Sequence, residues 1–326
     1  MRHEHMKIAF FDLLQSEQRV FKIISANYDC VFNKSSLTKQ IASTISDTQV
    51  LYIRSIAKLT KEILVELPQL EFITTRSTGF DHIDLEYCKK HKIVVSSVPT
   101  YATNAVAEHT FALLLGLSRK LLLCINQTKH GIVDAEKLRG FELKGKTLGV
   151  IGFGNIGSRV VEIARGFDMH ILVTTKHPST SRANKHRVQF VDLPTLLQKS
   201  DIVSLHVPLT DETKHMINQN NIHLFKKDSI LINTSRGPVV DTDALILGLE
   251  TGVLAGAGID VLEDERVFKR KYRTLRNRSR FLLEHNNVII TPHNAYNTKE
   301  AYQTILNLSA ENISAYIKGK PINRVL

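Results

Sequence analysis

The sequence predicts an α/β fold built from two mainly parallel sheets, and three observations lead to it. Ten short apolar runs recur along the chain, and each is followed by a stretch of helix length. The runs are continuous rather than alternating, which is typical of strands buried on both faces. Ten strands exceed one typical open sheet, and 326 residues suit two domains. We therefore expect two doubly wound parallel-sheet domains.

The expected elements follow the chain in order. The ten strands are expected at Ile8–Phe11, Val50–Ile53, Phe72–Thr75, Ile93–Val95, Leu148–Ile151, Ile171–Val173, Ile202–Leu205, Ile230–Ile232, Ala257–Val261 and Val288–Ile290. A domain boundary is expected near Pro99–Asn104, before one long helix from Ala105 to about Gln127. A last helix is expected over Thr298–Ile317, because Gly319 and Pro321 follow it as stop signals.

Composition and charge exclude several classes of protein. The net charge is +11, but eight cations and no acid lie within Arg266–Arg280. Because the excess is local, nucleic-acid binding is not expected, and the mildly basic remainder suits anionic ligands. No apolar run reaches the ~18 residues of a membrane span, and Ile8–Phe11 is too short for a signal peptide. Three distant cysteines predict neither a disulfide framework nor a metal site, so a cytoplasmic enzyme is expected.

A glycine-rich turn follows the strand that ends at Ile151. The spacing is GxGxxG, made by Gly152, Gly154 and Gly157, with Asn155 and Ile156 between the last two. The first glycine permits a tight turn, the second lets backbone approach a pyrophosphate, and the third lets helix and strand pack closely. Glycines also cluster in ordinary loops, but a strand before and a helix after favour a dinucleotide site.

The next strand ends where a dinucleotide-binding protein contacts the ribose. NAD enzymes usually place an acid there, whereas this chain has Thr175 and Lys176, with Arg182 slightly later. A hydroxyl and a cation would accept a 2′-phosphate that a carboxylate would repel. We therefore expect NAD or NADP as the cofactor, with NADP accepted. The alternative is that Lys176 points into solvent.

Three polar residues follow strand ends, where open α/β sheets bind ligands. Arg236, Glu265 and His293 come after the last three expected strands. Each has an ordinary alternative, as a surface arginine, as part of an acidic cluster and as a capping histidine. Their common position makes them candidate catalytic residues.

The order of motifs resembles the D-isomer-specific 2-hydroxyacid dehydrogenase family from about Val50 to Tyr302. The segments that carry the likeness are Thr103–His109, Gly152–Gly157, His206–Thr213, Asn233–Asp241, Gly258–Glu265 and Thr291–His293. The resemblance implies that His293 protonates a carbonyl oxygen as hydride arrives from nicotinamide, a task that suits an ordinary histidine pKa near ~6.5. Glu265 would bind the other ring nitrogen, and Arg236 would bind the substrate carboxylate. It further implies cofactor contacts at Val207, Pro208, Thr213, Thr234, Ser235 and Asp260.

Finer features are closest to the D-lactate dehydrogenase branch of that family. Tyr52, Tyr101 and Tyr296 lie where that branch places substrate-facing aromatic residues, and Thr78 and Gly79 lie where backbone N–H groups hold the carboxylate. These positions imply a small side-chain pocket, so a small 2-keto acid such as pyruvate is expected as the substrate. The alternative for the tyrosines is core packing with the hydroxyl at the surface.

The family's domain arrangement implies a Rossmann-like nucleotide domain, residues 103–296, inserted in a flavodoxin-like substrate domain, residues 1–102 plus 297–326. Hinges are expected at Tyr101–Asn104 and Tyr296–Thr298, and a homodimer through the helix Ala105–Leu123. The basic segment 266–280 lengthens the connection between Glu265 and His293. It is interpreted as a solvated loop, with an acidic partner or membrane surface as the alternative.

Two other functions remain open at this stage. One is a hydroxypyruvate, glyoxylate or phosphite dehydrogenase on the same scaffold, which would keep the same three residues; a formate dehydrogenase would instead have glutamine at position 265. The second is a nucleotide-sensing binding protein like the family's transcriptional corepressors. The complete set of Arg236, Glu265 and His293 favours an enzyme.

Overall fold

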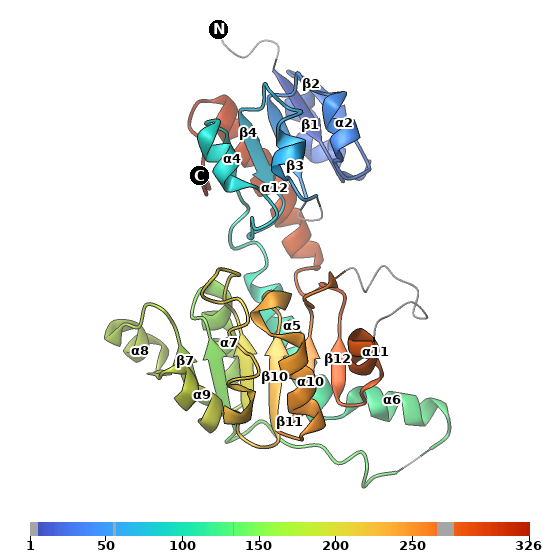
Figure 1. The fold of residues 1–326 in the computed structure, drawn as a ribbon, viewed down its shortest axis with the longest axis vertical. Helices are drawn as coiled ribbons and strands as arrows, with labels where there is room; N and C mark the ends of the chain where they lie inside the picture. The colour runs from blue at the N-terminus through green and yellow to red at the C-terminus, as the bar shows by residue number, and fades with distance from the viewer. Residues whose placement is uncertain (1–5, 55–56, 133, 266–276) are drawn as a thin grey trace. The chain divides into compact units, whose positions relative to one another are not determined.

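The computed structural model describes residues 6–54, 57–132, 134–265 and 277–326. The chain separates into two compact units, one made of Met1–Tyr101 with Thr298–Leu326 and the other of Ala102–Asn297 (Figure 1). The described residues include no helix long and apolar enough to cross a membrane.

The first unit holds a parallel sheet with the strand order β2-β1-β3-β4-β5 in the described residues. The strands are β1 (Lys7–Phe10), β2 (Asp29–Phe32), β3 (Val50–Ile53), β4 (Phe72–Thr75) and β5 (Val94–Ser96). This is the flavodoxin-like order, whose ligand position lies at the carboxyl ends of the strands where the order reverses, here between β1 and β3. The register pairs Phe10 with Tyr52 and Tyr52 with Thr74.

Helices cover both faces of this sheet. They are η1 (Gln18–Phe21), α1 (Lys22–Ser25), α2 (Lys39–Ser43), α3 (Lys61–Leu64), α4 (Leu85–Lys90) and α12 (Lys299–Ile317). Phe21 and Ile313 pack with Tyr52 on one face, whereas Leu64 and Cys88 pack on the other. Alternate strand residues therefore enter two separate cores, which explains why the apolar runs are continuous.

The second unit holds a parallel sheet with the order β12-β11-β10-β9-β6-β7-β8. The strands are β6 (Thr147–Ile151), β7 (His170–Thr174), β8 (Gln189–Phe190), β9 (Ile202–Leu205), β10 (Ser229–Asn233), β11 (Leu254–Ile259) and β12 (Val288–Ile290). Counted from β6, the order is that of a Rossmann fold with one added strand, and it reverses between β6 and β9. The predicted fold class is confirmed.

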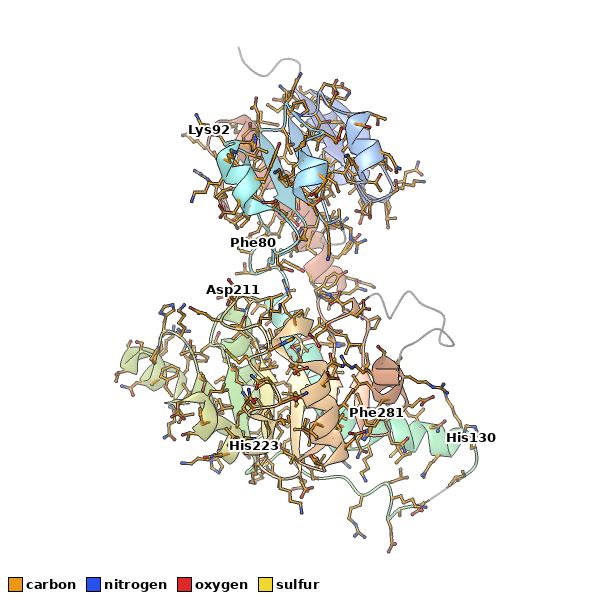
Figure 2. All side chains as sticks on the ribbon, viewed as in Figure 1. Phe80, Lys92, His130, Asp211, His223 and Phe281 are labelled. Atoms are coloured by element: carbon orange, nitrogen blue, oxygen red, sulfur yellow. The ribbon has the colours of Figure 1, made fainter. Side chains whose placement is uncertain are left out.

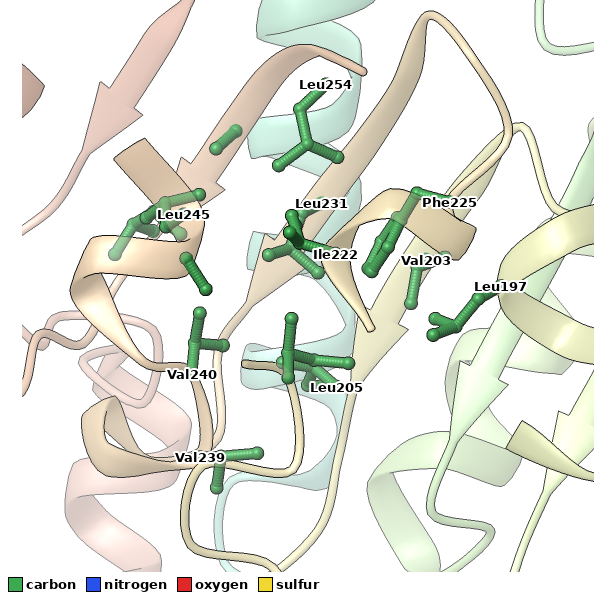
Figure 3. Packing of buried hydrophobic residues seen from close by; sticks show 14 of the residues in the cluster. Leu197, Val203, Leu205, Ile222, Phe225, Leu231, Val239, Val240, Leu245 and Leu254 are labelled. Carbon is green, nitrogen blue, oxygen red and sulfur yellow. The ribbon is translucent and has the colours of Figure 1, made fainter. Parts of the chain in front are cut away.

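Helices again form two layers. They are α5 (Thr103–Ser118), α6 (Leu121–Lys129), α7 (Asn155–Arg165), α8 (Thr180–His186), α9 (Leu193–Lys199), η2 (Ile222–Leu224), η3 (Gly237–Val239), α10 (Thr242–Glu250) and α11 (Asn277–Glu284). Figure 3 shows one core, in which Leu197 from α9 and Leu245 from α10 pack near strand residues such as Leu231. Phe111 of α5 and Val161 of α7 contribute to the other core.

Some predicted elements are corrected by the structure. The expected long helix from Ala105 to about Gln127 is two helices, because Lys120 takes a left-handed backbone conformation with φ 49° between α5 and α6. β2 and β8 were missed; both are edge strands, and their residues are exposed or half-buried.

The basic segment is only partly described. The prediction of a solvated loop concerns residues that, from 266 to 276, lie outside the described residues. At its end, Arg278 forms an ion pair of 2.6 Å with Asp243, and Arg280 forms one of 3.0 Å with Glu284. These two cations belong to the helix α11 rather than to a loop.

Candidate active site

The GxGxxG turn joins β6 to α7, and its glycines have different reasons to lack a side chain. Gly152 has φ 94°, and a Cβ there would lie 2.5 Å from the His206 carbonyl oxygen. A Cβ on Gly157 would overlap the Gly152 carbonyl oxygen. Gly154 differs, because no described atom beyond its own residue and its chain neighbours lies within 4 Å of a Cβ built on it. The protein therefore leaves space at Gly154, as close approach of a pyrophosphate requires.

The N-terminus of α7 offers backbone N–H groups that no side chain occupies. The helix begins at Asn155 and Ile156, and no side chain caps it. By contrast, Asp192 caps α9 and Asp241 caps α10 through hydrogen bonds to backbone N–H groups. Free N–H groups and the helix dipole favour an anion at this end. The residues present thus fit a dinucleotide pyrophosphate.

The end of β7 carries Thr175, which is half-buried, and Lys176, which is exposed. The Lys176 ammonium donates to both carboxylate oxygens of Glu212, at 2.9 and 2.7 Å. The hydrogen bond from Lys176 lowers the pKa of Glu212. Lys176 is therefore an exposed lysine, as the solvent alternative expected, but it has a counter-charge in Glu212. Glu212 belongs to His206–Thr213, one of the segments that carry the family resemblance, but its pairing with a lysine 36 positions away has no signal in the sequence.

A second cation lies against the turn itself. Arg182 of α8 donates a hydrogen bond to the Phe153 carbonyl oxygen, and its guanidinium carbon lies 4.8 Å from the centre of the Phe153 ring. Phe153 is the residue between Gly152 and Gly154. Arg182 is therefore a functional candidate that sequence reasoning mentioned but did not assign.

The loop after β9 lies against the same turn. A Cβ on Gly152 would lie 2.8 Å from the Val207 side chain, and the Thr213 hydroxyl donates to the Pro208 carbonyl oxygen at 2.6 Å. His206 precedes this loop, and its Nε2 lies 2.8 Å from the Ser204 hydroxyl. Burial lowers the pKa of His206 to about 3, so the imidazole is neutral at ordinary pH. Figure 2 labels Asp211, an exposed residue of the same loop.

Glu265 and His293 meet although 28 positions separate them. Glu265 follows β11 and His293 follows β12, and these strands are parallel neighbours. The His293 Nδ1 lies 2.9 Å from Glu265 Oε1 and 3.1 Å from Oε2. Because an ionised carboxylate only accepts, Nδ1 carries the hydrogen and Nε2 remains for a substrate. The His293 side chain is 38% exposed, so the ring is accessible.

Asp260 holds the turn that presents His293. It is fully buried, and it accepts hydrogen bonds from the Asn294 N–H at 2.8 Å, the Ala295 N–H at 2.9 Å and the Thr291 hydroxyl at 2.5 Å. His293 itself has φ 52°, a strained conformation that such bonds stabilise. This structural role of Asp260 was not predicted, since its contacts join residues 31 to 35 positions apart.

Arg236 lies at the end of β10 in a turn built by Asn233. The Asn233 side chain accepts from the Ser235 hydroxyl at 2.8 Å and donates to the Arg236 carbonyl oxygen at 3.0 Å. The Arg236 guanidinium donates to the Ser235 carbonyl oxygen at 2.8 Å and is half-buried. Thr234 is buried, with its hydroxyl 3.0 Å from that of Thr110. Arg236, Glu265 and His293 thus follow three adjacent parallel strands.

In the first unit, a short loop follows β4. The Ser77 hydroxyl donates to the Gly79 carbonyl oxygen at 2.6 Å, and the Thr78 hydroxyl donates to the Val98 carbonyl oxygen at 3.0 Å. Among the described residues, the backbone N–H groups of Thr78 and Gly79 have no acceptor. Two adjacent free N–H groups suit a carboxylate. Figure 2 labels Phe80, the next residue, whose ring is exposed.

The predicted tyrosines differ in their surroundings. Tyr52 is fully buried, with its ring 5.3 Å from Phe10 and 5.2 Å from Phe21, and its hydroxyl has no partner among the described residues. This favours core packing, although the hydroxyl is buried rather than at the surface as that alternative expected. Tyr296 is half-buried, with its ring 6.2 Å from that of His293. Tyr101 is half-buried at the end of the first unit.

An open dinucleotide turn and a histidine–carboxylate pair at the carboxyl edge of one parallel sheet define a nicotinamide-dependent oxidoreductase. No group of three or more metal-ligating side chains occurs in the part of the chain that the structure describes. Comparison with known proteins agrees with this class. Residues 111–295 match the model of the D-isomer specific 2-hydroxyacid dehydrogenase, NAD binding domain.

Three similar proteins illustrate the range of activities for which relatives of this chain are named. The glyoxylate reductase of Thermococcus litoralis is 39% identical over 270 residues, 81% of this chain and 78% of that protein. The D-lactate dehydrogenase of Aquifex aeolicus, solved with NAD and lactic acid, is 36% identical with a TM-score of 0.89 over 96% of each chain. An acyclic imino acid reductase, solved with NADPH and D-Arg, is 31% identical with a TM-score of 0.87, over 98% of this chain and 100% of that one.

The chain belongs to the D-isomer-specific 2-hydroxyacid dehydrogenase family, as its motifs predict. It is an enzyme that uses NAD or NADP. The corepressor alternative is therefore set aside.

Proposed function

We propose that the chain reduces a small 2-keto acid to the D-2-hydroxy acid, of the pyruvate to D-lactate type. The observation that carries this proposal is the contact of 2.9 Å between His293 Nδ1 and Glu265, with Arg236 at the end of the adjacent strand β10. Such a set provides a proton donor, a group that orients it and a cation for a carboxylate.

The reduction follows from these positions. Arg236 binds the substrate carboxylate and polarises the neighbouring carbonyl. His293, as imidazolium, donates the proton on Nε2 to the carbonyl oxygen. A nicotinamide cofactor, when held at the glycine turn, would supply the hydride that the carbonyl carbon takes up. Glu265 accepts from Nδ1–H and stabilises the imidazolium, which gives up its proton to the oxygen. One carbonyl π bond is lost, and one C–H and one O–H bond form.

The proposed substrate is small for two reasons. Tyr296 lies beside His293 and limits the space for a substrate side chain. Two of the three similar proteins described above are named for lactate and glyoxylate, and the corresponding 2-oxo acids, pyruvate and glyoxylate, differ by one methyl group. We favour pyruvate over glyoxylate because the loop with Thr78 and Gly79 resembles that of the D-lactate dehydrogenase branch; both acids carry the carboxylate that its N–H groups would bind.

The decisive experiment is a panel of 2-keto acids, with NADH and NADPH in parallel, that scores the chirality of the product. Pyruvate is expected to give D-lactate with a higher kcat/KM than a large aromatic 2-keto acid. If the aromatic acid, hydroxypyruvate or glyoxylate is reduced with a higher kcat/KM than pyruvate, pyruvate is not the preferred substrate and the proposal is wrong on this point. His293→Ala, with cofactor binding retained, is the control that ties turnover to this site.

The remaining site roles belong to the same proposal. Residues 103–296 would bind the dinucleotide, and residues 1–102 with 297–326 would bind the substrate. The predicted cofactor and substrate residues keep these roles, except Tyr52, which packs in a core. The free thiols of Cys30, Cys88 and Cys124 have no part in the mechanism.

The active form is proposed to be a homodimer, with a different helix at its interface from the one the sequence suggested. Much of α5 packs into its own core, where Phe111 and Leu114 are buried. The neighbouring helix α6 has no buried residue, and Leu121, Leu122 and Ile125 on it are 47%, 53% and 51% exposed. Apolar side chains gathered on one exposed helix favour contact with a second copy.

A further inference from the structure

A buried ion pair lies in the first unit, next to the loop that follows β4. Arg76 follows β4 and Glu17 precedes η1, and their side chains are only 3% and 4% exposed. The Arg76 Nη2 lies 3.3 Å from Glu17 Oε1. The other Glu17 oxygen accepts from the Leu14 N–H at 2.6 Å. Both carboxylate oxygens are therefore occupied.

The rest of the guanidinium is also enclosed. Its Nη1 donates to the Asp12 carbonyl oxygen at 3.3 Å, and its central carbon lies 5.1 Å from the Tyr302 ring centre and 5.7 Å from that of Tyr52. These partners come from the segment after β1, from β3 and from α12. They meet at the carboxyl ends of β1, β3 and β4, beside the point where the strand order reverses. Open α/β sheets bind ligands at this point.

Stability alone is a poor explanation for such a pair. Removing two charges from water costs free energy that their attraction often fails to recover, and an apolar pair of similar volume is often equally stable. What a buried, hydrogen-bonded guanidinium provides is a fixed position, because its planar fork has few acceptable geometries. The segment that it fixes is the one that leaves β4.

That segment is the loop Ser77–Gly79. On the backbone side, the Arg76 N–H makes the last bond to β3, at 2.9 Å from the Ile53 carbonyl oxygen. Beyond it, the Ser77 hydroxyl donates to the Gly79 carbonyl oxygen and so accepts from Thr75 at 3.0 Å, and Thr75 in turn lies 3.0 Å from His82 Nε2. Arg76 and this chain of hydroxyl groups thus hold the loop from its two ends.

We propose that Arg76, paired with Glu17, is a positioning residue that holds the N–H groups of Thr78 and Gly79 in the geometry that binds the substrate carboxylate. This role rests on the proposed function, since it assumes a 2-keto acid substrate. Arg76 itself does not touch the substrate, because its side chain is enclosed by Glu17, Asp12 and the two tyrosines.

The test separates positioning from folding by removing both charges together. Arg76→Met alone leaves Glu17 buried without its partner and is expected to destabilise the chain. Arg76→Met with Glu17→Gln removes both charges, keeps an acceptor for the Leu14 N–H and should recover most of the lost Tm. Arg76→Lys keeps the charge without the planar fork.

Four quantities are measured on each full-length variant: Tm, Kd for NADH, the kinetic constants for pyruvate, and Kd for oxamate in the presence of NADH. Methyl pyruvate, which lacks the carboxylate charge, is measured in parallel. In the double variant we expect unchanged NADH binding, a KM for pyruvate and a Kd for oxamate raised about tenfold, and kcat changed less. The preference for pyruvate over methyl pyruvate should fall by a similar factor, and Arg76→Lys should be intermediate.

The outcomes separate the two proposals. A double variant with recovered Tm, wild-type KM and wild-type preference for pyruvate would overturn the positioning role and leave the proposed function intact. A wild-type chain that binds NADH but neither reduces pyruvate nor binds oxamate would overturn the proposed function, and this role with it.

Discussion

Nδ1 of His293 lies 2.9 Å from Oε1 of Glu265, and the two residues follow the neighbouring parallel strands β12 and β11. The contact keeps a hydrogen on Nδ1, so Nε2 is left for the substrate and carries the transferable proton when the ring is an imidazolium. His293→Ala is expected to lower kcat by about 10³-fold, and Glu265→Gln by roughly 10²-fold, because the amide keeps the shape but not the charge. Steady-state kinetics measures both, with Kd for NADH as the control. Turnover unaffected by Glu265→Gln would contradict the assigned role of the pair.

Gly154→Ala is predicted to separate cofactor binding from folding. A Cβ at Gly154 meets no described atom beyond its own residue and its chain neighbours within 4 Å, so the Tm should change little, while the Kd for NADH should rise about tenfold or more. Gly152→Ala is the matched control. Its φ of 94° and the His206 carbonyl oxygen at 2.5 Å predict a loss of about 1–3 kcal/mol in the free energy of unfolding. Unchanged NADH binding in Gly154→Ala would contradict the assignment of this turn as the pyrophosphate site.

The pair formed by Lys176 and Glu212 predicts how the cofactor is selected. Both side chains are 68% exposed, so the pair is weak and a 2′-phosphate would displace Glu212 readily. Glu212→Gln should therefore raise kcat/KM for NADPH only a few-fold and leave that for NADH unchanged. Lys176→Ala should lower kcat/KM for NADPH by about tenfold. Equal losses with NADH and NADPH in Lys176→Ala would show that the lysine does not read the 2′-position.

His206 predicts a specific loss of stability in acid. Burial lowers the pKa of His206 from 6.5 to about 3. Between these two pH values, the imidazole is protonated in the unfolded chain and neutral in the folded chain. The free energy of unfolding therefore falls as pH falls from about 6.5 towards 3, by up to about 1.4 kcal/mol per pH unit. Denaturant unfolding at pH 7, 6 and 5 should show a steeper decline in the wild type than in His206→Gln. Parallel curves would mean that His206 titrates normally.

The exposed helix α6 predicts the oligomeric state. Leu122→Glu with Ile125→Glu places two charges where the second copy would pack, so the dimer should dissociate at micromolar concentration. Sedimentation velocity measures this directly. Leu247→Glu on α10, a side chain that is 40% exposed, is the matched control and should leave the dimer intact. A wild-type chain that sediments as a monomer would refute the proposal.

Sequence patterns alone led to the fold class and to the positions of most strands along the chain. Continuous apolar runs mark strands buried on both faces, and Val50–Ile53, Phe72–Thr75 and Ile202–Leu205 have the predicted bounds. The pattern failed at two of the four sheet edges, β2 and β8, whose residues are exposed or half-buried. It failed again at Lys120, whose left-handed backbone divides a helix that the side-chain pattern continues.

The positions of Arg236, Glu265 and His293 were readable from sequence because each follows a buried strand, and parallel strands bring such positions to one edge. Which partners meet there was decided only by the tertiary structure. Lys176 meets Glu212 and Arg76 meets Glu17 across 36 and 59 positions. Local periodicity reports which face of an element is buried, but the order of strands in a sheet determines which distant charges come within hydrogen-bond distance.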